Sequence, residues 1–212
     1  MPIWRLRTTP AISDEISLGV TRDPAFGDNM RFVTDTAGRM SQMIAGMLDY
    51  ARLQNCSDAF GSVALEDILN IVKLNLQPLI EESGAELQVD ALPTVWGDRT
   101  QLAMLFQELV INAIKYRKPD APLRIHITSE PVNEGEIRLA IADNGTGFDP
   151  ANRREVFQAY RQLATPRKTE GCGIGLASCA KIVRHHGGII GVNTQPEEGA
   201  TFYFTLPVPP LA

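Results

Sequence analysis

The chain has 212 residues, of which 44% are hydrophobic and 21% are charged, and its net charge is −5. This length and balance fit a globular protein with one sizeable domain and a smaller appendage. The negative net charge argues against a nucleic-acid-binding surface. No apolar run reaches the roughly 18 residues that a membrane span needs. No signal peptide opens the chain and its three cysteines lack metal-binding spacing, so we expect a reduced, cytoplasmic protein.

The first recognisable element is a long helix. Over residues 28–53, apolar side chains recur at steps of three or four, which predicts a helix whose apolar seam pairs with another helix. We therefore expect a homodimer through residues 28–53. Residues 55–62 are polar and contain glycine, which predicts a linker. The expected division is a helical segment over residues 1–54 and a larger domain over residues 55–212.

The larger domain should contain both helices and strands. Periodicity predicts strands at residues 62–64, 85–89, 94–96, 123–129, 136–142, 189–193 and 201–206, and helices at residues 65–82, 99–117 and 175–186. Pro78 should kink or break the first helix. Asp98 should cap the second helix, with Gln101 completing a capping box. Mostly antiparallel strands with helices grouped on one face predict an α+β sandwich.

The helix predicted over residues 99–117 carries an unusual polar stripe. Glu108, Asn112 and Lys115 are spaced by four and three residues, so they share one face that is separate from the apolar face. A carboxylate, a carboxamide and an ammonium group together could hold a hydrated divalent cation and the phosphates it bridges. The same residues would also suit a solvated face with an internal ion pair, and this stretch alone does not decide between the two.

Two glycine-rich loops offer further candidate binding residues. Asp143 ends a predicted strand and could accept a hydrogen bond from an exocyclic amine, while Gly145 and Gly147 would let the backbone approach a flat ring. Residues 171–176, GCGIGL, open a helix and could present N–H groups to phosphate. The first motif also describes a plain turn. The polar residues 150–170 between the loops are either a solvated loop or a mobile lid.

In this order, the segments QELVINAIKY, DNGTGF, EVFQAY, GCGIGL and HHGG resemble the N, G1, F and G2 boxes of the histidine-kinase ATPase domain. That domain has the Bergerat fold, an α/β sandwich with a mixed, mainly antiparallel sheet covered by helices on one face. The resemblance covers about residues 55–207. Within it, ESGAELQVDALPTVWGDRTQL and NAIKYRKPD look like the phytochrome-associated, light-regulated sensor histidine kinases. Residues 28–53 look like the second helix of their dimerisation and phosphotransfer hairpin.

The resemblance implies a role for each matching residue. Asn112 would ligate the Mg²⁺ that bridges the ATP phosphates, Glu108 would assist the metal or the incoming nucleophile, and Lys115 would contact phosphate. Asp143 would bind the adenine amino group. The other implied nucleotide contacts are Tyr116, Gly145, Gly147, Arg161, Lys168, Gly171, Gly173, Gly175 and Leu176.

The implied function is the ATP-binding catalytic portion of a two-component sensor histidine kinase, which passes the γ-phosphoryl group of ATP to a histidine and onward to the receiver domain of a response regulator. The acceptor histidine is not evident, because His126, His185 and His186 all lie inside the implied ATPase domain. Autophosphorylation of this chain is therefore not expected. The alternative is a regulatory or phosphotransfer module that keeps the ATP-binding fold and docks a partner kinase or response regulator. Neither nucleic acid nor a membrane is an expected partner of this chain.

Overall fold

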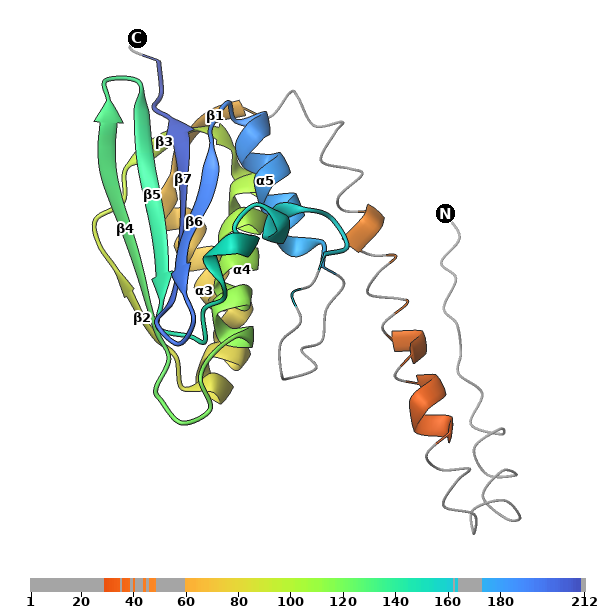
Figure 1. Cartoon of the computed structure of the whole chain (residues 1–212). Helices are drawn as coiled ribbons and strands as arrows, with labels where there is room; N and C mark the ends of the chain where they lie inside the picture. The colour runs from red at the N-terminus through yellow and green to blue at the C-terminus, as the bar shows by residue number, and fades with distance from the viewer. Residues whose placement is uncertain are drawn as a thin grey trace, which may run out of the picture. The chain divides into compact units, whose positions relative to one another are not determined.

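The computed structural model describes residues 29–34, 36–38, 40, 44, 46–48, 60–161, 163 and 173–210 (Figure 1). It divides into two compact units, residues 1–42 and 43–212. In the first unit, the described residues 29–34, 36–38 and 40 are helical, as their apolar period predicts. Within the described residues, every helix is too short or too polar to span a lipid bilayer.

The second unit contains two sheets. Strands β1 (Phe60–Ala64) and β3 (Thr94–Asp98) form an antiparallel pair. The larger sheet has the strand order β2-β4-β5-β7-β6, and its neighbours are antiparallel except for the parallel pair β2 and β4. Its strands are β2 (Glu86–Val89), β4 (Arg124–Asn133), β5 (Glu136–Asp143), β6 (Ile190–Gln195) and β7 (Gly199–Pro207). The predicted mixed, mainly antiparallel sheet is confirmed.

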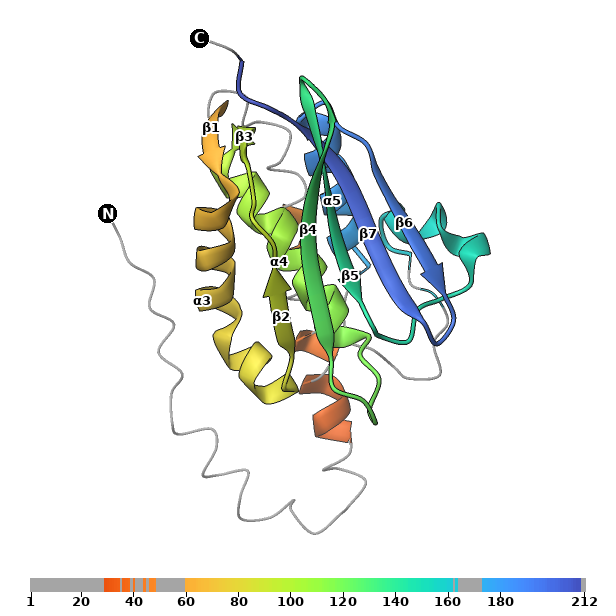
Figure 2. The same ribbon diagram turned by 90° about the vertical axis from the view of Figure 1, so that its left-hand side faces the viewer.

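Helices α3 (Leu65–Ser83), α4 (Arg99–Lys115) and α5 (Gly175–His185) lie together on one side of the larger sheet (Figure 2). The apolar stripe of α4 packs into the core, where Leu105 and Phe106 are fully buried. The Phe106 ring meets Phe204 of β7 edge to face, with the ring centroids 5.7 Å apart. This apolar face fixes α4 against the sheet, so the polar face of the same helix has a defined direction.

The start of α4 is partly as predicted. Asp98 caps the helix, because its Oδ1 accepts hydrogen bonds from the N–H groups of Thr100 at 2.8 Å and Gln101 at 3.0 Å. The predicted capping box is wrong: the Asp98 N–H donates to Nε2 of His186 over 3.0 Å instead. The Oε1 atom of Gln101 lies 2.9 Å from Nδ1 of His185. Two histidines at the end of α5 thus take the place of the predicted contact between the Gln101 side chain and the Asp98 N–H.

Two other boundaries differ from the sequence prediction. Helix α3 continues through Pro78 to Ser83 without a break, and Gly84 then ends it at a φ of 63°. Strand β1 begins at Phe60, inside the segment predicted as a linker. The earlier linker residues 55–59 lie outside the described residues.

Candidate nucleotide-binding site

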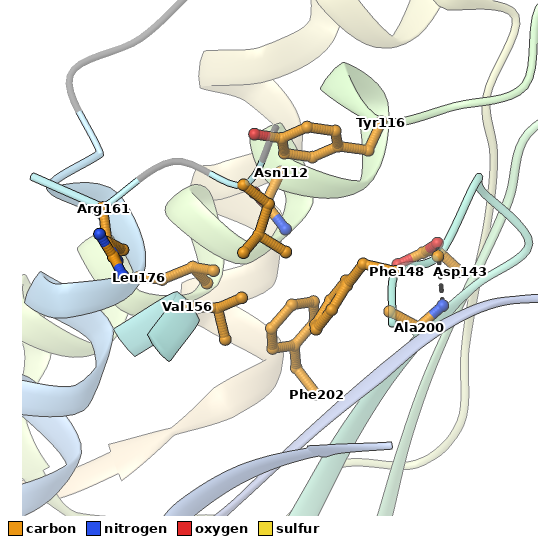
Figure 3. Close-up of a pocket in the computed structure, with 11 residues that line it drawn as sticks. Asn112, Tyr116, Asp143, Phe148, Val156, Arg161, Leu176, Ala200 and Phe202 are labelled. Atoms are coloured by element: carbon orange, nitrogen blue, oxygen red, sulfur yellow. Dashed lines mark hydrogen bonds between the residues drawn. The ribbon is translucent and has the colours of Figure 1, made fainter. Parts of the chain in front are cut away.

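A pocket of about 70 Å³ lies between α4, α5, the end of β5 and β7 (Figure 3). It is lined by Asn112, Tyr116, Asp143, Gly147, Phe148, Val156, Arg161, Leu163, Leu176, Ala200 and Phe202. Figure 3 shows Arg161 and Leu176 toward one end of the pocket and Asp143 with Ala200 at the other. The pocket therefore joins a cationic end and an acidic end across an apolar middle.

Helix α4 supplies two of the lining residues at its C-terminal end. Asn112 and Tyr116 are one turn apart, so both side chains reach the pocket from the same face. Both are half-buried. The Tyr116 N–H donates to the Asn112 carbonyl oxygen over 3.1 Å and closes the helix. The carboxamide and the phenol ring thus have positions set by the packed helix rather than by a loop.

The other two members of the polar stripe lie beside the pocket without lining it. The Lys115 ammonium nitrogen is 5.1 Å from the centroid of the Tyr116 ring, within cation–π distance. The Glu108 carboxylate reaches the first residue of α5, because a Cβ built on Gly175 would lie 2.3 Å from Glu108 Oε2. Glycine at position 175 therefore leaves room for this carboxylate near the positive end of the α5 dipole.

Asp143 is fixed at the opposite end of the pocket. Its Oδ1 accepts hydrogen bonds from the N–H groups of Gly145 at 2.9 Å and Ala200 at 3.3 Å, the second of which is drawn in Figure 3. Burial raises the pKa of the Asp143 carboxyl above its ordinary value, and the two N–H groups lower it by a smaller amount. Within the described residues both bonds use Oδ1, which leaves Oδ2 to accept from a ligand.

The glycines after Asp143 make close contact with protein backbone. A Cβ on Gly145 would lie 2.6 Å from the Tyr116 carbonyl oxygen, and one on Gly147 would lie 2.0 Å from that of Gln195. Gly147 also has a φ of 57°. The Thr146 N–H donates to the Tyr116 carbonyl oxygen over 2.9 Å. The loop is therefore held between the end of α4 and the turn that joins β6 to β7.

The segment after this loop forms two short 3-10 helices, η1 (Pro150–Asn152) and η2 (Glu155–Phe157), and buried Val156 of η2 lines the pocket. The Tyr160 N–H donates to the Gly173 carbonyl oxygen over 2.8 Å, which ties together the two ends of the segment over residues 160–173. Of the predicted site residues on this segment, Arg161 lines the pocket. Lys168 and Gly171 lie outside the described residues.

The structure brings together several residues that the sequence singled out. Of these residues, Asn112, Tyr116, Asp143, Gly147, Arg161 and Leu176 line the pocket. Glu108, Lys115, Gly145, Gly173 and Gly175 are not among the lining residues. Sequence reasoning missed Phe148, Val156, Leu163, Ala200 and Phe202 as part of the site. Phe148 directly follows the glycines of the first loop, and this position could have indicated that it belongs to the site.

The oxygen donors at the pocket suit a metal ion that is also held by the phosphates of a bound ligand. In the part of the chain that the structure describes, no group of three or more histidine, cysteine, aspartate or glutamate side chains could hold a metal ion. Mg²⁺ commonly binds through one or two protein oxygens, with substrate phosphates and water completing its shell. Asn112, at the pocket, offers such an oxygen.

Comparison with known protein families shows which family this chain belongs to. Residues 97–210, more than half of the sequence, match the family described as histidine kinase-, DNA gyrase B- and HSP90-like ATPases. The chain belongs to this ATPase family. The matched range contains all the residues that line the pocket.

Relatives within the family include bacterial signalling proteins. Cyanobacterial phytochrome A from Nostoc sp. (strain PCC 7120) is 41% identical over 177 residues, which are 84% of this chain and 23% of the phytochrome. The chain thus spans less than a quarter of the length of that relative.

Two solved structures of histidine kinases share the fold. Full-length ShkA in complex with AMPPNP superposes with a TM-score of 0.69 at 26% identity, over 87% of this chain and 40% of ShkA. Histidine kinase ThkA in complex with the response regulator TrrA superposes with a TM-score of 0.66 over 94% of this chain and 56% of ThkA. At 20% identity, the likeness to ThkA shows the fold alone.

Proposed function

We propose that this chain is the ATP-binding catalytic portion of a two-component histidine kinase and that ATP binds in the pocket of Figure 3. The observation that carries the proposal is the presence of a half-buried aspartate, Asp143, together with Asn112 and Arg161 in one pocket. An adenine amino group is a donor for the Asp143 carboxylate, and phosphates are anions for Arg161. The AMPPNP bound to ShkA supports the same ligand class here.

Each residue has a definite task in this proposal. Asp143 Oδ2 accepts from the exocyclic amine of adenine, while Phe148 and Phe202 provide the apolar walls that pack against the base. Asn112 offers its amide oxygen to Mg²⁺, which would neutralise charge that develops on the phosphates. Glu108 lies next to the N-terminus of α5 and is placed to assist the metal or the nucleophile. Arg161 pairs with the terminal phosphate.

Nucleotide entry requires movement of the segment that carries Arg161 and Leu163. The pocket holds about 70 Å³, whereas sites for drug-sized ligands commonly hold about 300–1,000 Å³. Arg161 and Leu163 are the lining residues that lie beyond the short 3-10 helices, in the segment tied by Tyr160 and Gly173. We propose that the described residues Arg161 and Leu163 move aside to admit ATP and return against it once it is bound.

The three histidines are proposed to be structural, so the phosphoryl acceptor is another histidine. His186 is 4% exposed, and its two ring nitrogens contact the Asp98 N–H and the Ile182 carbonyl oxygen. Burial lowers the pKa of His186, which keeps the ring neutral. His185 contacts Gln101 and His126 contacts Asp90. None of these histidines lines the pocket.

The proposed partners are a receiver domain and a second copy of the chain. The ThkA complex with TrrA supports a response regulator as the protein that takes the phosphoryl group onward. Exposed apolar side chains on the helical residues 29–34, 36–38 and 40, among them Phe32 at 66% and Met40 at 59%, support a homodimer through residues 28–53. We propose a cytoplasmic location, because this chemistry draws on ATP. We also keep the division at residues 54 and 55 as the proposed domain boundary.

The alternative function is a regulatory module that keeps the ATP-binding fold and docks a partner kinase. One experiment separates it from a catalytic domain: titration of the purified chain with ATP and Mg²⁺, followed by incubation with γ-labelled ATP and a separately supplied histidine-bearing hairpin from a related kinase. Mg-ATP binding with acid-labile labelling of the added hairpin supports the catalytic role. Binding without transfer favours the regulatory module, and absence of nucleotide binding rejects both.

A further inference from the structure

The side chain of Thr194 contacts residues of the nucleotide pocket without lining the pocket itself. Thr194 is on β6, opposite Ala200 of β7, and is 5% exposed. Its Oγ1 atom accepts a hydrogen bond from the Phe148 N–H over 3.0 Å. The same oxygen lies 3.1 Å from the Gly199 carbonyl oxygen and 3.3 Å from that of Phe148. One buried hydroxyl thus joins the loop after β5 to the turn between β6 and β7.

These contacts form a chain of hydrogen bonds that ends at Asp143. A hydroxyl has one hydrogen, and the nearer of the two carbonyl oxygens is that of Gly199. This carbonyl belongs to the same peptide group as the Ala200 N–H, which donates to Asp143 Oδ1 over 3.3 Å (Figure 3). A donor bound to the oxygen of a peptide group polarises that group and strengthens the hydrogen bond made by its N–H. The chain therefore runs from the Phe148 N–H through Thr194 and this peptide group to the carboxylate.

Both ends of this chain belong to the site. Phe148 and Asp143 are half-buried, and both line the pocket. Another bond between the same two segments uses backbone alone, because the Glu197 N–H donates to the Thr146 carbonyl oxygen over 2.7 Å. That bond is independent of which side chains are present, whereas the bonds of Thr194 require a hydroxyl. The identity of residue 194 therefore affects how the loop is held against the turn.

We propose that Thr194 is a positioning residue for recognition of the nucleotide base, a role that rests on the proposed function. Its hydroxyl fixes the Phe148 backbone and the peptide group between Gly199 and Ala200. Through that peptide group it holds the Asp143 carboxylate toward the base. Without the hydroxyl, the Phe148 N–H and the Gly199 carbonyl oxygen each lose a partner. A buried polar group without a partner is costly, so the loop would shift and the base acceptor would lose its fixed position.

A second buried threonine of the same sheet provides a matched control. Thr205 on β7 is 2% exposed, and its Oγ1 accepts a hydrogen bond from the Ile189 N–H over 3.0 Å, the same length as the bond to Thr194. Neither Thr205 nor Ile189 lines the pocket. Valine has the shape of threonine without the hydroxyl, so Thr194→Val and Thr205→Val each remove one buried hydroxyl from the sheet. The two variants differ in whether that hydroxyl is connected to Asp143.

The first measurement is titration of the natural chain and its variants with ATP and Mg²⁺. Thr194→Val should bind ATP about tenfold more weakly, the effect of losing one buried hydrogen bond, whereas Thr205→Val should bind ATP as the natural chain does. Thr194→Ser keeps the hydroxyl and should restore most of the affinity. Unchanged affinity in Thr194→Val, or equal losses in the two valine variants, would overturn the proposal.

A further variant keeps this test decisive if Thr194→Val does not fold, which urea unfolding would show. Thr194→Cys replaces the hydroxyl by a thiol, a weaker donor and acceptor. Its affinity for ATP should be lower than that of Thr194→Ser. Equal affinity in these two variants would count against a role for the hydroxyl.

The second measurement follows Asp143 itself, in the chain without nucleotide. The Ala200 N–H lowers the pKa of the Asp143 carboxyl, against the larger effect of burial. A weaker bond from Ala200 should therefore raise this pKa further in Thr194→Val and leave it unchanged in Thr205→Val. NMR of the carboxyl carbon over a pH series measures it, and an unchanged or lowered pKa in Thr194→Val would overturn the proposal. All variants keep the ionisable side chains on the segments around Asp143 and at the pocket, which are Tyr116, Lys118, Arg124, Arg161, Glu197 and Glu198.

The two measurements separate this proposal from the function on which it rests. Absence of ATP binding by the natural chain would reject the proposed function, and the pKa of Asp143 would then still show whether Thr194 holds this carboxylate. ATP binding by the natural chain, with no difference between Thr194→Val and Thr205→Val, would leave the proposed function intact and reject the role of Thr194.

Discussion

Arg161 donates hydrogen bonds from Nε and Nη2 to the same carboxylate oxygen of Glu155, over 3.2 and 3.0 Å. The two side chains are 56% and 42% exposed, so water screens the pair. Exposed pairs of this kind contribute about 0–1 kcal/mol. Arg161 lines the pocket, so in the proposed function it would exchange Glu155 for an ATP phosphate with a small loss of free energy.

The first prediction concerns Glu155→Gln. Removing the carboxylate frees Arg161 from its present partner, so affinity for Mg-ATP should rise by up to about fivefold, the equivalent of roughly 1 kcal/mol. The gain should shrink as salt screens the original pair. Isothermal titration at low and high ionic strength measures both effects.

A matched control exists on the sheet. Glu130→Gln breaks another exposed pair, in which Arg138 Nη1 lies 3.1 Å from the Glu130 carboxylate, and neither residue lines the pocket. This control should leave ATP affinity unchanged. Weaker ATP binding in Glu155→Gln would show that Glu155 holds Arg161 in its productive position.

The second prediction concerns Asn112→Ala. Asn112 is half-buried and lines the pocket, so its removal should leave the fold intact. Loss of the amide oxygen that we propose as a Mg²⁺ ligand should abolish the Mg²⁺-dependent part of ATP affinity. Titration with ATP, with and without Mg²⁺, measures this part directly. Asn75→Ala, on the exposed side of α3, serves as the control, and an unchanged Mg²⁺ dependence in Asn112→Ala would remove the metal role from this residue.

Element order was predictable from sequence because each element buries one face. The apolar stripe of α4 and the alternation of β4 and β5 gave the right structures within a few residues. Which strands pair with one another was harder to predict. Strands β1 and β3 form their own sheet, with Phe60 opposite Asp98, and no local pattern marks a register between strands on either side of α3 and β2.

Sequence motifs predicted the site residues that belong to them. Residues that reach the site only through the packing of the folded chain were not predictable. Asp143 and Asn112 belong to short motifs with their own chemistry, and both line the pocket. Ala200 enters through its N–H group, which any residue except proline could supply, so its identity gave no signal. The Gln101 capping box failed for a related reason, because His185 lies 84 residues away in the sequence and the contact arises only in the folded chain.

The third prediction separates backbone strain from lack of space at two glycines. Gly84 and Gly147 have similar φ angles, 63° and 57°, but a Cβ on Gly84 would meet nothing within 4 Å. Gly84→Ala should therefore lower the free energy of unfolding by only about 1 kcal/mol, the effect of left-handed φ on alanine.

Gly147→Ala carries the same strain and a steric clash. Its Cβ would lie 2.0 Å from the Gln195 carbonyl oxygen, so backbone must shift at the base of the pocket. We expect a further loss of about 1–3 kcal/mol and weaker ATP binding. Urea unfolding of the two variants makes the comparison, and equal losses would mean that the loop relaxes freely.

The fourth prediction is a pH dependence that originates at Asp143. Burial is the main reason that the pKa of this carboxyl is raised in the folded chain. The folded state therefore holds the proton more tightly than the unfolded chain does. As pH rises from the ordinary aspartate pKa, about 3.9, through the raised value, the free energy of unfolding should lose the contribution of this group.

Asp143→Asn tests the sign of this effect. The asparagine stays neutral and can still accept from Gly145 and Ala200 through its oxygen. Stability of the variant relative to the natural chain should therefore increase as pH rises through the window above about 3.9. Urea unfolding at several pH values measures it. Asp120→Asn, a substitution at an exposed position, serves as the control.

The same carboxylate should give ATP affinity the opposite dependence on pH. Its ionised form is the better acceptor for the adenine amino group, so affinity of the natural chain for ATP should rise as pH increases through the raised pKa. In Asp143→Asn the affinity should be lower and should lose this component of its pH dependence. ATP should also lose its preference over GTP in the variant, since guanine presents a carbonyl oxygen where adenine has the amino group. A preserved preference for ATP would place the recognition of adenine on another residue and leave Asp143 with a purely structural role.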